Sequence, residues 1–262
     1  MFFVESEVKM ITNLKEHVRN EFSSETTQAS YIKIAGEGLW LSETYFFNKY
    51  FPNTKALFLD IGCGTGRTTI PLHEMGYNIT GIDFVPAMID NANKIAQERG
   101  LAINYQIGDA TDLQFNDNTF DYALFSNQGW TQIPGKENRF KALCEIYRVL
   151  RKDGVFIFTA HPRVLGSIFS LFWWKQRFKY YLLRPLGFRI SEVDFGDRFF
   201  SRGNIGSGSN FSSKQFIHIP SIREVVKQIH RTKFSILEIN GSLQISEKDI
   251  RKHPPVYYVC KK

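Results

Sequence analysis

Cysteine is scarce in this chain of 262 residues, where Cys63, Cys144 and Cys260 stand far apart. An odd number of cysteines without paired spacing argues against a disulfide framework and against a cysteine-based zinc site. The six histidines also lack the spacing of a metal cluster. We therefore expect neither a disulfide bond nor a bound metal.

Long apolar runs are absent as well. A membrane-spanning helix needs ~18–20 apolar residues, and the longest run here, residues 164–174, is interrupted by Gly166, Ser167 and Ser170. The first ten residues, MFFVESEVKM, carry acidic side chains where a secretory signal carries basic ones. These absences predict a cytoplasmic protein without a transmembrane segment.

Acidic residues become few in the second part of the chain. Residues 1–160 hold 15 Lys and Arg against 19 Asp and Glu, whereas residues 161–262 hold 18 against 7. Such an asymmetry indicates that the second part faces an anionic partner, such as nucleic acid, a phosphorylated small molecule or a membrane surface. A solvated basic surface that keeps the protein soluble explains the same counts, and both interpretations stay open.

The hydrophobic pattern changes from helical to alternating along the chain. Apolar residues at helical spacing predict helices over 5–22 and 37–51, the second stopped by Pro52. Short β-prone runs then alternate with helices, which predicts a parallel sheet covered on both faces. Strands are expected at 56–60, 78–83, 102–107, 122–125, 155–160, 235–239 and 256–260, and helices from 67, at 86–99, at 136–150 and at 221–230.

Three glycines, Gly62, Gly64 and Gly66, alternate directly after the first strand and before a helix. Ligands bind at this edge of a parallel sheet, and glycine lets the backbone turn sharply and approach a cofactor closely. A dinucleotide fingerprint would require glycine at the position of Arg67. The spacing therefore disfavours a nicotinamide-dependent dehydrogenase.

The stretch LDIGCGTG (59–66) resembles the first motif of class I S-adenosylmethionine-dependent methyltransferases. GIDFVPAMIDNA (81–92), GDATDLQFNDNTFDYALFS (108–126) and YRVLRKDGVFIFTAHP (147–162) resemble the family in the same order. The resemblance implies a Rossmann-like, doubly wound, seven-stranded sheet, mostly parallel with an antiparallel last strand. It also implies S-adenosylmethionine as the cofactor and S-adenosylhomocysteine as its product.

The same resemblance implies roles for single residues. Asp60 and Gly62 would lie near the methionine end, Asp83 would accept the ribose hydroxyls, and Asp109 with Ala110 would contact the adenine. Ser126 would line the reacting methyl, and the expected cofactor-binding set is completed by Tyr31, Gly64, Gly66 and Phe84. Capping and turn formation are the alternative for the aspartates, and helix packing is the alternative for Tyr31.

Methyl transfer needs little chemistry from the protein, because the sulfonium is already an activated donor. A general base is required only if the acceptor loses a proton. His161 and His218 are candidates by position, and a structural role is the alternative for each. Many family members that methylate amino groups carry the motif Asn/Asp-Pro-Pro-aromatic after the fourth strand. This chain has SNQGW (126–130) there instead, which argues against methylation of a nucleic-acid base amine through that motif.

We expect four parts: a helical lead-in (1–52), a cofactor-binding core (53–162), an inserted lid that binds substrate (163–215), and a last helix with two strands (216–262). The insertion interleaves Trp173, Trp174, Tyr180 and Tyr181 with cations, and a Gly/Ser loop at 202–211 is a candidate moving lid. Aromatic rings interleaved with cations can enclose an aromatic or anionic substrate, stack on RNA or rest on a membrane. The same residues are equally compatible with a helix that simply packs its apolar side chains into a lid subdomain.

The predicted function is methyl transfer to a small molecule, aromatic or anionic, at oxygen, nitrogen or carbon. An RNA-modifying enzyme is the alternative that the basic second part favours. A non-catalytic, cofactor-binding partner protein is a further alternative, because SNQGW contains no unmistakable catalytic group.

Overall fold

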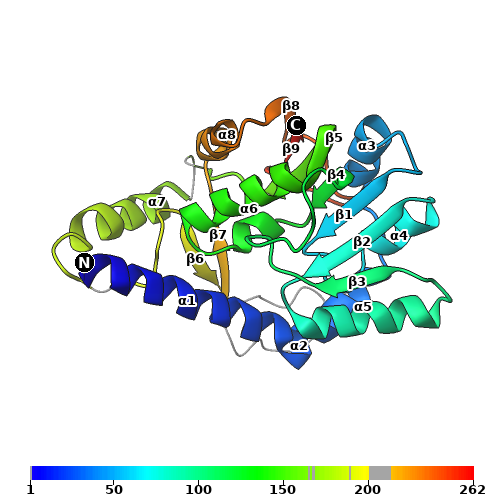
Figure 1. The fold of residues 1–262 in the computed structure, drawn as a ribbon. Coiled ribbons are helices and arrows are strands. Elements are labelled where there is room, and N and C mark those ends of the chain that lie inside the picture. The colour runs from blue at the N-terminus through cyan, green and yellow to red at the C-terminus, as the bar shows by residue number, and fades with distance from the viewer. Residues whose placement is uncertain (1, 165, 167–168, 189, 201–213) are drawn as a thin grey trace.

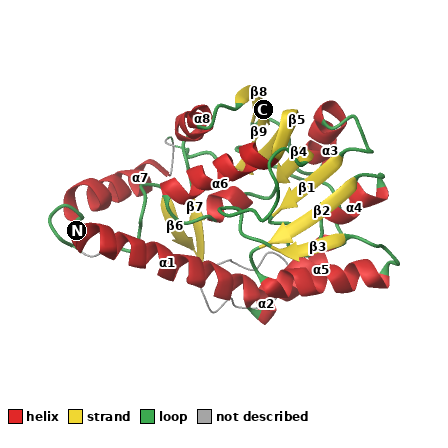
Figure 2. Cartoon of the chain, in the orientation of Figure 1, coloured by secondary structure: helices red, strands yellow, loops and turns green. Residues whose placement is uncertain are grey.

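The computed structural model describes residues 2–164, 166, 169–188, 190–200 and 214–262. Its centre is a seven-stranded sheet in the order β3-β2-β1-β4-β5-β9-β8 (Figure 1, Figure 2). Its strands are β1 (Leu57–Ile61), β2 (Asn78–Asp83), β3 (Asn104–Ile107), β4 (Phe120–Phe125), β5 (Leu150–Ala160), β8 (Ser235–Asn240) and β9 (Val256–Lys261).

The directions of the strands confirm the predicted fold class. β1 pairs in parallel with β2 on one side and with β4 on the other. β9 runs antiparallel to both β5 and β8. Because the strand order reverses between β1 and β4, the carboxyl ends of these two strands form the switch point at which doubly wound sheets bind ligands.

Helices cover both faces of this sheet. The helices are α1 (Phe2–Ser23), α2 (Glu25–Ala35), α3 (Leu41–Tyr50), α4 (Thr69–Glu74), α5 (Pro86–Glu98), α6 (Lys136–Val149) and α8 (Ile222–Arg231), with the short η1 (Gly129–Gln132) just before α6; α1 and α2 pack beside α5. Neighbouring residues of a strand point to opposite faces, and Phe58 and Leu59 accordingly enter different core clusters. Ile146 of α6 and Ile229 of α8 pack on the side of Leu59. Phe47 of α3 packs on the side of Phe58. The sheet is thus buried on both faces.

The N-terminal segment differs from the sequence prediction. An unpredicted helix, α2, lies between the two predicted ones, and the chain breaks before it at Ser24 and after it between Gly36 and Trp40. Gly38 takes a positive φ of 69°, and the Trp40 backbone N–H donates to the Glu43 carboxylate at 2.8 Å. This cap begins α3 at Leu41, four residues later than the predicted helix over 37–51.

After β5 the chain leaves the sheet, as predicted, and forms α7 (Phe169–Phe178), the π-helical turn η2 (Lys179–Leu183) and β6 (Asp197–Phe200). β6 pairs with β7 (Gln215–His218) in a second, antiparallel sheet that the sequence did not predict. The predicted Gly/Ser loop at 202–211 lies outside the described residues. The division of the chain into four parts stays a prediction.

None of the described helices is both long enough and apolar enough to cross a membrane.

Candidate active site

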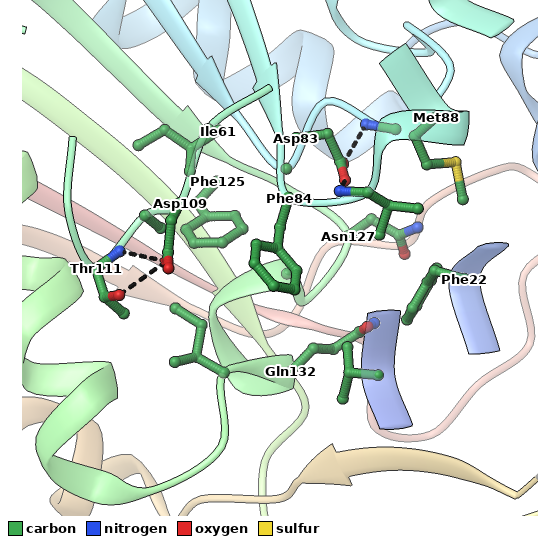
Figure 3. A pocket seen from close by; sticks show the side chains of 18 of the residues that line it. Phe22, Ile61, Asp83, Phe84, Met88, Asp109, Thr111, Phe125, Asn127 and Gln132 are labelled. Atoms are coloured by element: carbon green, nitrogen blue, oxygen red, sulfur yellow. Dashed lines mark hydrogen bonds between the residues drawn. The ribbon is translucent and has the colours of Figure 1, made fainter. Parts of the chain in front are cut away.

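A pocket opens at the carboxyl edge of the sheet, at the predicted switch point. It holds about 920 Å³ of space free of protein atoms, its open mouth included. Its walls come from the loop after β1, the ends of β2 and β4, the turn after β3, the segment from η1 to α6, and α1. Figure 3 shows side chains from these elements converging on one hollow.

The structure brings together most of the predicted cofactor residues. The pocket is lined by Tyr31, Gly62, Gly64, Asp83, Phe84, Asp109, Ala110 and Ser126. Four other predicted residues do not line it, namely Asp60, Gly66, His161 and His218.

The glycine loop is built from positive φ angles. Gly62 and Gly64 have φ values of 62° and 55°, a conformation that side chains with a Cβ rarely adopt. A Cβ on Gly62 would lie 2.7 Å from the Phe125 ring, and one on Gly64 would lie 3.4 Å from the Tyr31 ring. The loop therefore exposes bare backbone at the floor of the pocket.

Asp83 ends β2 and ties the glycine loop to the following turn. Its two carboxylate oxygens each accept a backbone N–H at 2.9 Å, one from Gly64 and one from Val85 (Figure 3). Burial raises the pKa of Asp83 to about 6, because low-dielectric surroundings disfavour the charged carboxylate. The carboxylate thus lies at the pocket in a defined orientation.

Asp109 lies in the turn after β3 and contacts α1. One carboxylate oxygen accepts the Thr111 backbone N–H at 2.9 Å and the Thr111 hydroxyl at 2.8 Å. The other oxygen pairs with the Lys15 ammonium. Burial alone would raise the pKa of Asp109, but the hydrogen bond from Lys15 and those from Thr111 lower it below its ordinary value.

Helix α1 forms a wall of the pocket that the sequence did not predict. Lys15, Val18 and Phe22 line the hollow, and Lys15 also lies 4.9 Å from the centre of the Phe84 ring. The spacing of three and four residues puts these side chains on one face of the helix. The helical spacing of Val18 and Phe22 was visible in the sequence, but the surface that they cover was not.

The insertion after β5 supports α1. Val193 of the insertion and Phe216, which follows it in β7, form a buried cluster with Leu14 of α1. A ring nitrogen of His17 lies 2.6 Å from the Lys214 carbonyl oxygen. None of the described residues of the insertion lines the pocket, so a role of the insertion as substrate lid stays a prediction.

Ser126 is held by a buried ion pair. The Arg67 guanidinium donates to both carboxylate oxygens of Glu43, at 2.6 and 2.7 Å, and also to the Ser126 hydroxyl at 3.2 Å. The Glu43 side chain is fully buried, and 7% of the Arg67 side chain is exposed. Arg67 stands where a dinucleotide-binding loop would have glycine. Its structural partner is Glu43, 24 residues away in the sequence.

Asp60 and the two histidines lie elsewhere. The Asp60 carboxylate accepts the hydroxyls of Thr68 and Thr69 at 2.6 and 2.7 Å, beneath the loop. Burial lowers the pKa of His161 to about 4. His218 is fully buried in β7, with its ring nitrogens 2.7 Å from Asp197 and 2.8 Å from a Glu224 oxygen. In this structure neither histidine faces the pocket, although each was a candidate base.

The fold also gathers three groups with metal-ligand chemistry that the sequence spacing did not reveal. Ligand atoms of Asp194, Asp197 and His218 lie within 4.8 Å of one another. The Arg139 guanidinium, however, already donates to Asp194 at 2.7 Å. The Arg139 side chain therefore already supplies positive charge to this cluster, as a bound metal ion would.

The far end of the pocket is formed by the stretch after Ser126. Asn127 and Gln128 have positive φ angles of 46° and 59°, which non-glycine residues rarely adopt and which cluster at functional sites. The Gln128 backbone N–H donates to the Thr159 hydroxyl at 2.9 Å, which holds the turn. Beyond it the wall continues with Gln132, Ile133, Pro134 and Asn138.

Comparisons with known proteins agree with this geometry. A family model described as "Methyltransferase domain" matches residues 59–158. A demethylmenaquinone methyltransferase of Lactobacillus johnsonii is 32% identical over 213 residues, which cover 78% of this chain and 80% of the relative. A ubiquinone/menaquinone biosynthesis C-methyltransferase of Rickettsia felis is 34% identical over 143 residues, which cover 52% of this chain and 55% of the relative. This chain therefore spans only about half of the second relative.

A solved structure shows the same fold. An S-adenosylmethionine-dependent methyltransferase of Methanosarcina mazei superposes with a TM-score of 0.64 at 21% identity, covering 83% of this chain and 96% of that one. The matched core spans β1 to β5 and contains the glycine loop. The chain belongs to the class I family of S-adenosylmethionine-dependent methyltransferases.

Proposed function

We propose that this protein transfers a methyl group from S-adenosylmethionine to a small, ring-containing acceptor of low polarity, of the quinol type. The observation that carries the proposal is the composition of the pocket beyond the cofactor residues. Phe125, Ile133 and Pro134 line it together with Val18 of α1. An apolar recess with a few amide groups fits a neutral ring better than a phosphate. The names of the relatives from Lactobacillus johnsonii and Rickettsia felis point to the same acceptor class.

The residues at the sheet edge fit the proposed cofactor. Asp83 would accept the ribose hydroxyls, and Asp109 would accept the adenine amine. The backbone of Gly62 and Gly64 and the hydroxyl of Ser126 would face the methionine end. The glycine loop supports this assignment, since a Cβ at Gly62 would meet the Phe125 ring and would occupy the floor of the pocket.

The protein's side chains would promote the reaction by positioning the acceptor and by excluding water from the pocket. When bound, the cofactor supplies an electrophilic methyl group, and transfer requires the acceptor atom in line with it. Among the described lining residues the titratable side chains are Lys15, Tyr31, Asp83 and Asp109, and three of these would hold the cofactor or cover it. An acceptor that carries its own acidic hydroxyl, such as a quinol, fits a site of this composition.

The acceptor class can be tested with tritiated S-adenosylmethionine and three acceptors: a short-chain demethylmenaquinol, a simple catechol and unmodified transfer RNA. We expect label in the quinol. Label confined to RNA would favour the nucleic-acid alternative. Tight cofactor binding with no labelled product would favour a non-catalytic partner protein.

A charged side chain at the far end of the pocket should block the acceptor and spare the cofactor. We expect Ile133→Arg to lower turnover of the quinol by about a hundredfold, with cofactor affinity changed by less than about threefold. Ile250→Arg is the matched control, because Ile250 is 96% exposed. Equal turnover of the two variants would contradict the assignment of this recess.

Cofactor binding should weaken in acid. Because burial raises the pKa of Asp83 to about 6, this carboxylate becomes protonated below that pH and loses an acceptor for the ribose diol. The ionised fraction falls about tenfold for each pH unit below the pKa. Calorimetry between about pH 7.5 and about pH 5 should therefore show roughly tenfold weaker binding at the acidic end.

The pH dependence has an internal control. Asp109 has a lowered pKa and stays ionised over this range. Burial raises the pKa of Asp60, beneath the glycine loop, to about 6 as well, so a variant at Asp83 is needed to assign the change. The Asp83→Ala variant should bind the cofactor with the same low affinity at every pH. An affinity of the unchanged protein that is constant across the range would show that Asp83 does not receive the diol.

A further inference from the structure

One segment outside the active site exposes many large apolar side chains. α7, η2 and the residues that follow them form a surface that we call the α7 face. Its members are 38–67% exposed: Phe169, Leu171, Trp174, Phe178, Tyr181, Leu182, Leu186 and Phe188. Exposed apolar patches of this kind, rimmed by charge, mark interaction sites.

The spacing shows that the exposure is arranged along one side of a helix. Leu171, Trp174 and Phe178 follow one another at three and four residues, which places them on one stripe. The Trp174 and Phe178 rings stack with centroids 6.4 Å apart. The opposite side of α7 carries Trp173, which is 5% exposed and packs edge-on against Phe195. The helix therefore packs Trp173 into the fold and carries an outer apolar stripe that the described residues leave exposed.

The charged residues within the sequence of the α7 face are all positive. No acidic residue occurs between Asp153 and Glu192, whereas Lys175, Arg177, Lys179 and Arg184 lie within α7, η2 and their continuation. Lys179 is neutralised by Glu192 at 2.8 Å. Lys175 and Arg177 are exposed, and the Arg177 guanidinium also lies 6.0 Å from the centre of the Phe195 ring. Exposed positive charge therefore lies next to the apolar stripe.

We propose that the α7 face lies on an anionic lipid surface, with the Leu171–Trp174–Phe178 stripe in the interface and the cations against the headgroups. Outward Leu, Trp and Phe beside Lys and Arg are the composition of helices that lie in a membrane interface. Figure 1 shows α7 at one end of the molecule, apart from the strands of the large sheet, where a flat surface can reach it.

Two other occupants fit the α7 face less well. A second copy of the chain would place the same cations opposite one another, because a two-fold interface pairs a patch with itself. Single-stranded RNA would stack on the rings but would leave the aliphatic Leu171, Leu182 and Leu186 without a partner. The proposal does not depend on which acceptor the active site methylates.

The test is co-sedimentation of the full-length protein with vesicles. We expect binding to phosphatidylcholine vesicles that contain phosphatidylglycerol, weaker binding to pure phosphatidylcholine, and loss of binding with added salt. The double variant Leu171→Ser with Trp174→Ser should bind anionic vesicles at least about tenfold more weakly. Ile250→Ser is the matched control, since Ile250 is 96% exposed outside the α7 face.

A fluorescence measurement locates the contact. Brominated phosphatidylglycerol should quench Trp174, which is 66% exposed, while Trp130 and Trp173, at 0% and 5%, stay shielded. Trp174→Phe should remove most of the quenching and keep most of the sedimentation. Absence of vesicle binding, or equal binding by the double variant, would overturn the proposal. So would a dimer that the double variant converts to a monomer while the unchanged protein ignores vesicles.

Discussion

Replacing Asp83 by alanine is expected to weaken the binding of S-adenosylmethionine by a hundredfold or more. In the proposed pose the carboxylate accepts both ribose hydroxyls. A hydrogen bond to a charged group contributes about 1.5–3 kcal/mol, and each 1.4 kcal/mol changes an affinity about tenfold. Loss of two such bonds therefore predicts at least the stated effect, which calorimetric titration measures directly.

The Asp83 substitution also removes hydrogen bonds that hold the glycine loop, so controls must separate lost contacts to the cofactor from a disturbed loop. The carboxylate accepts the Gly64 and Val85 backbone N–H groups, and alanine leaves both groups to find other partners. Asp83→Asn keeps the side-chain volume and one oxygen acceptor, and we expect it to bind with intermediate affinity. Asp90→Ala changes an exposed aspartate of α5 and should bind like the unchanged protein. Full affinity in Asp83→Ala, with a normal thermal unfolding curve, would contradict the assigned role.

Replacing Glu43 by alanine is expected to lower the free energy of unfolding by about 3–5 kcal/mol, because it leaves the Arg67 guanidinium buried without its counter-charge. Arg67 would keep its bonds to the Gly38 carbonyl oxygen at 3.0 Å and to Ser126, but neither carries negative charge. Urea denaturation gives the change as a shift of the midpoint at constant slope.

A pair on the surface provides the comparison for Glu43. Arg99 lies 3.9 Å from Glu74, with both side chains largely exposed, and such pairs contribute about 0–1 kcal/mol. Glu74→Ala should therefore unfold almost like the unchanged protein. The double variant Glu43→Ala with Arg67→Met should recover part of the lost stability, since it removes the unpaired charge as well. A Glu43→Ala protein as stable as Glu74→Ala would show that the buried pair contributes little.

The sheet could be predicted from the sequence because its signals are local. Each strand is a short apolar run, and turn residues separate it from the next helix. The last helix, predicted at 221–230, is a case in point: it begins where the Ser221 hydroxyl accepts the Glu224 backbone N–H at 3.2 Å. The glycine loop was recognisable for the same reason, since its three residues are adjacent to the strand that positions them.

The missed features depend on contacts between distant residues. The stripe of Lys15, Val18 and Phe22 shows which face of α1 is buried, but helical periodicity contains no information on what covers it. Glu43 and Arg67 pair across 24 residues, and neither stands in a motif that indicates the other. The candidate base His218 illustrates the converse error, because its position in the sequence could not show that Asp197 and Glu224 enclose it.

In our proposal the pocket between the glycine loop and α1 holds the cofactor. A crystal structure of the protein with S-adenosylhomocysteine tests it most directly. We predict the ribose hydroxyls within hydrogen-bond distance of the Asp83 carboxylate and the adenine beside Asp109, beneath Val18 and Phe22 of α1. A nucleoside bound elsewhere on the chain, or bound here with its ribose away from Asp83, would contradict the account.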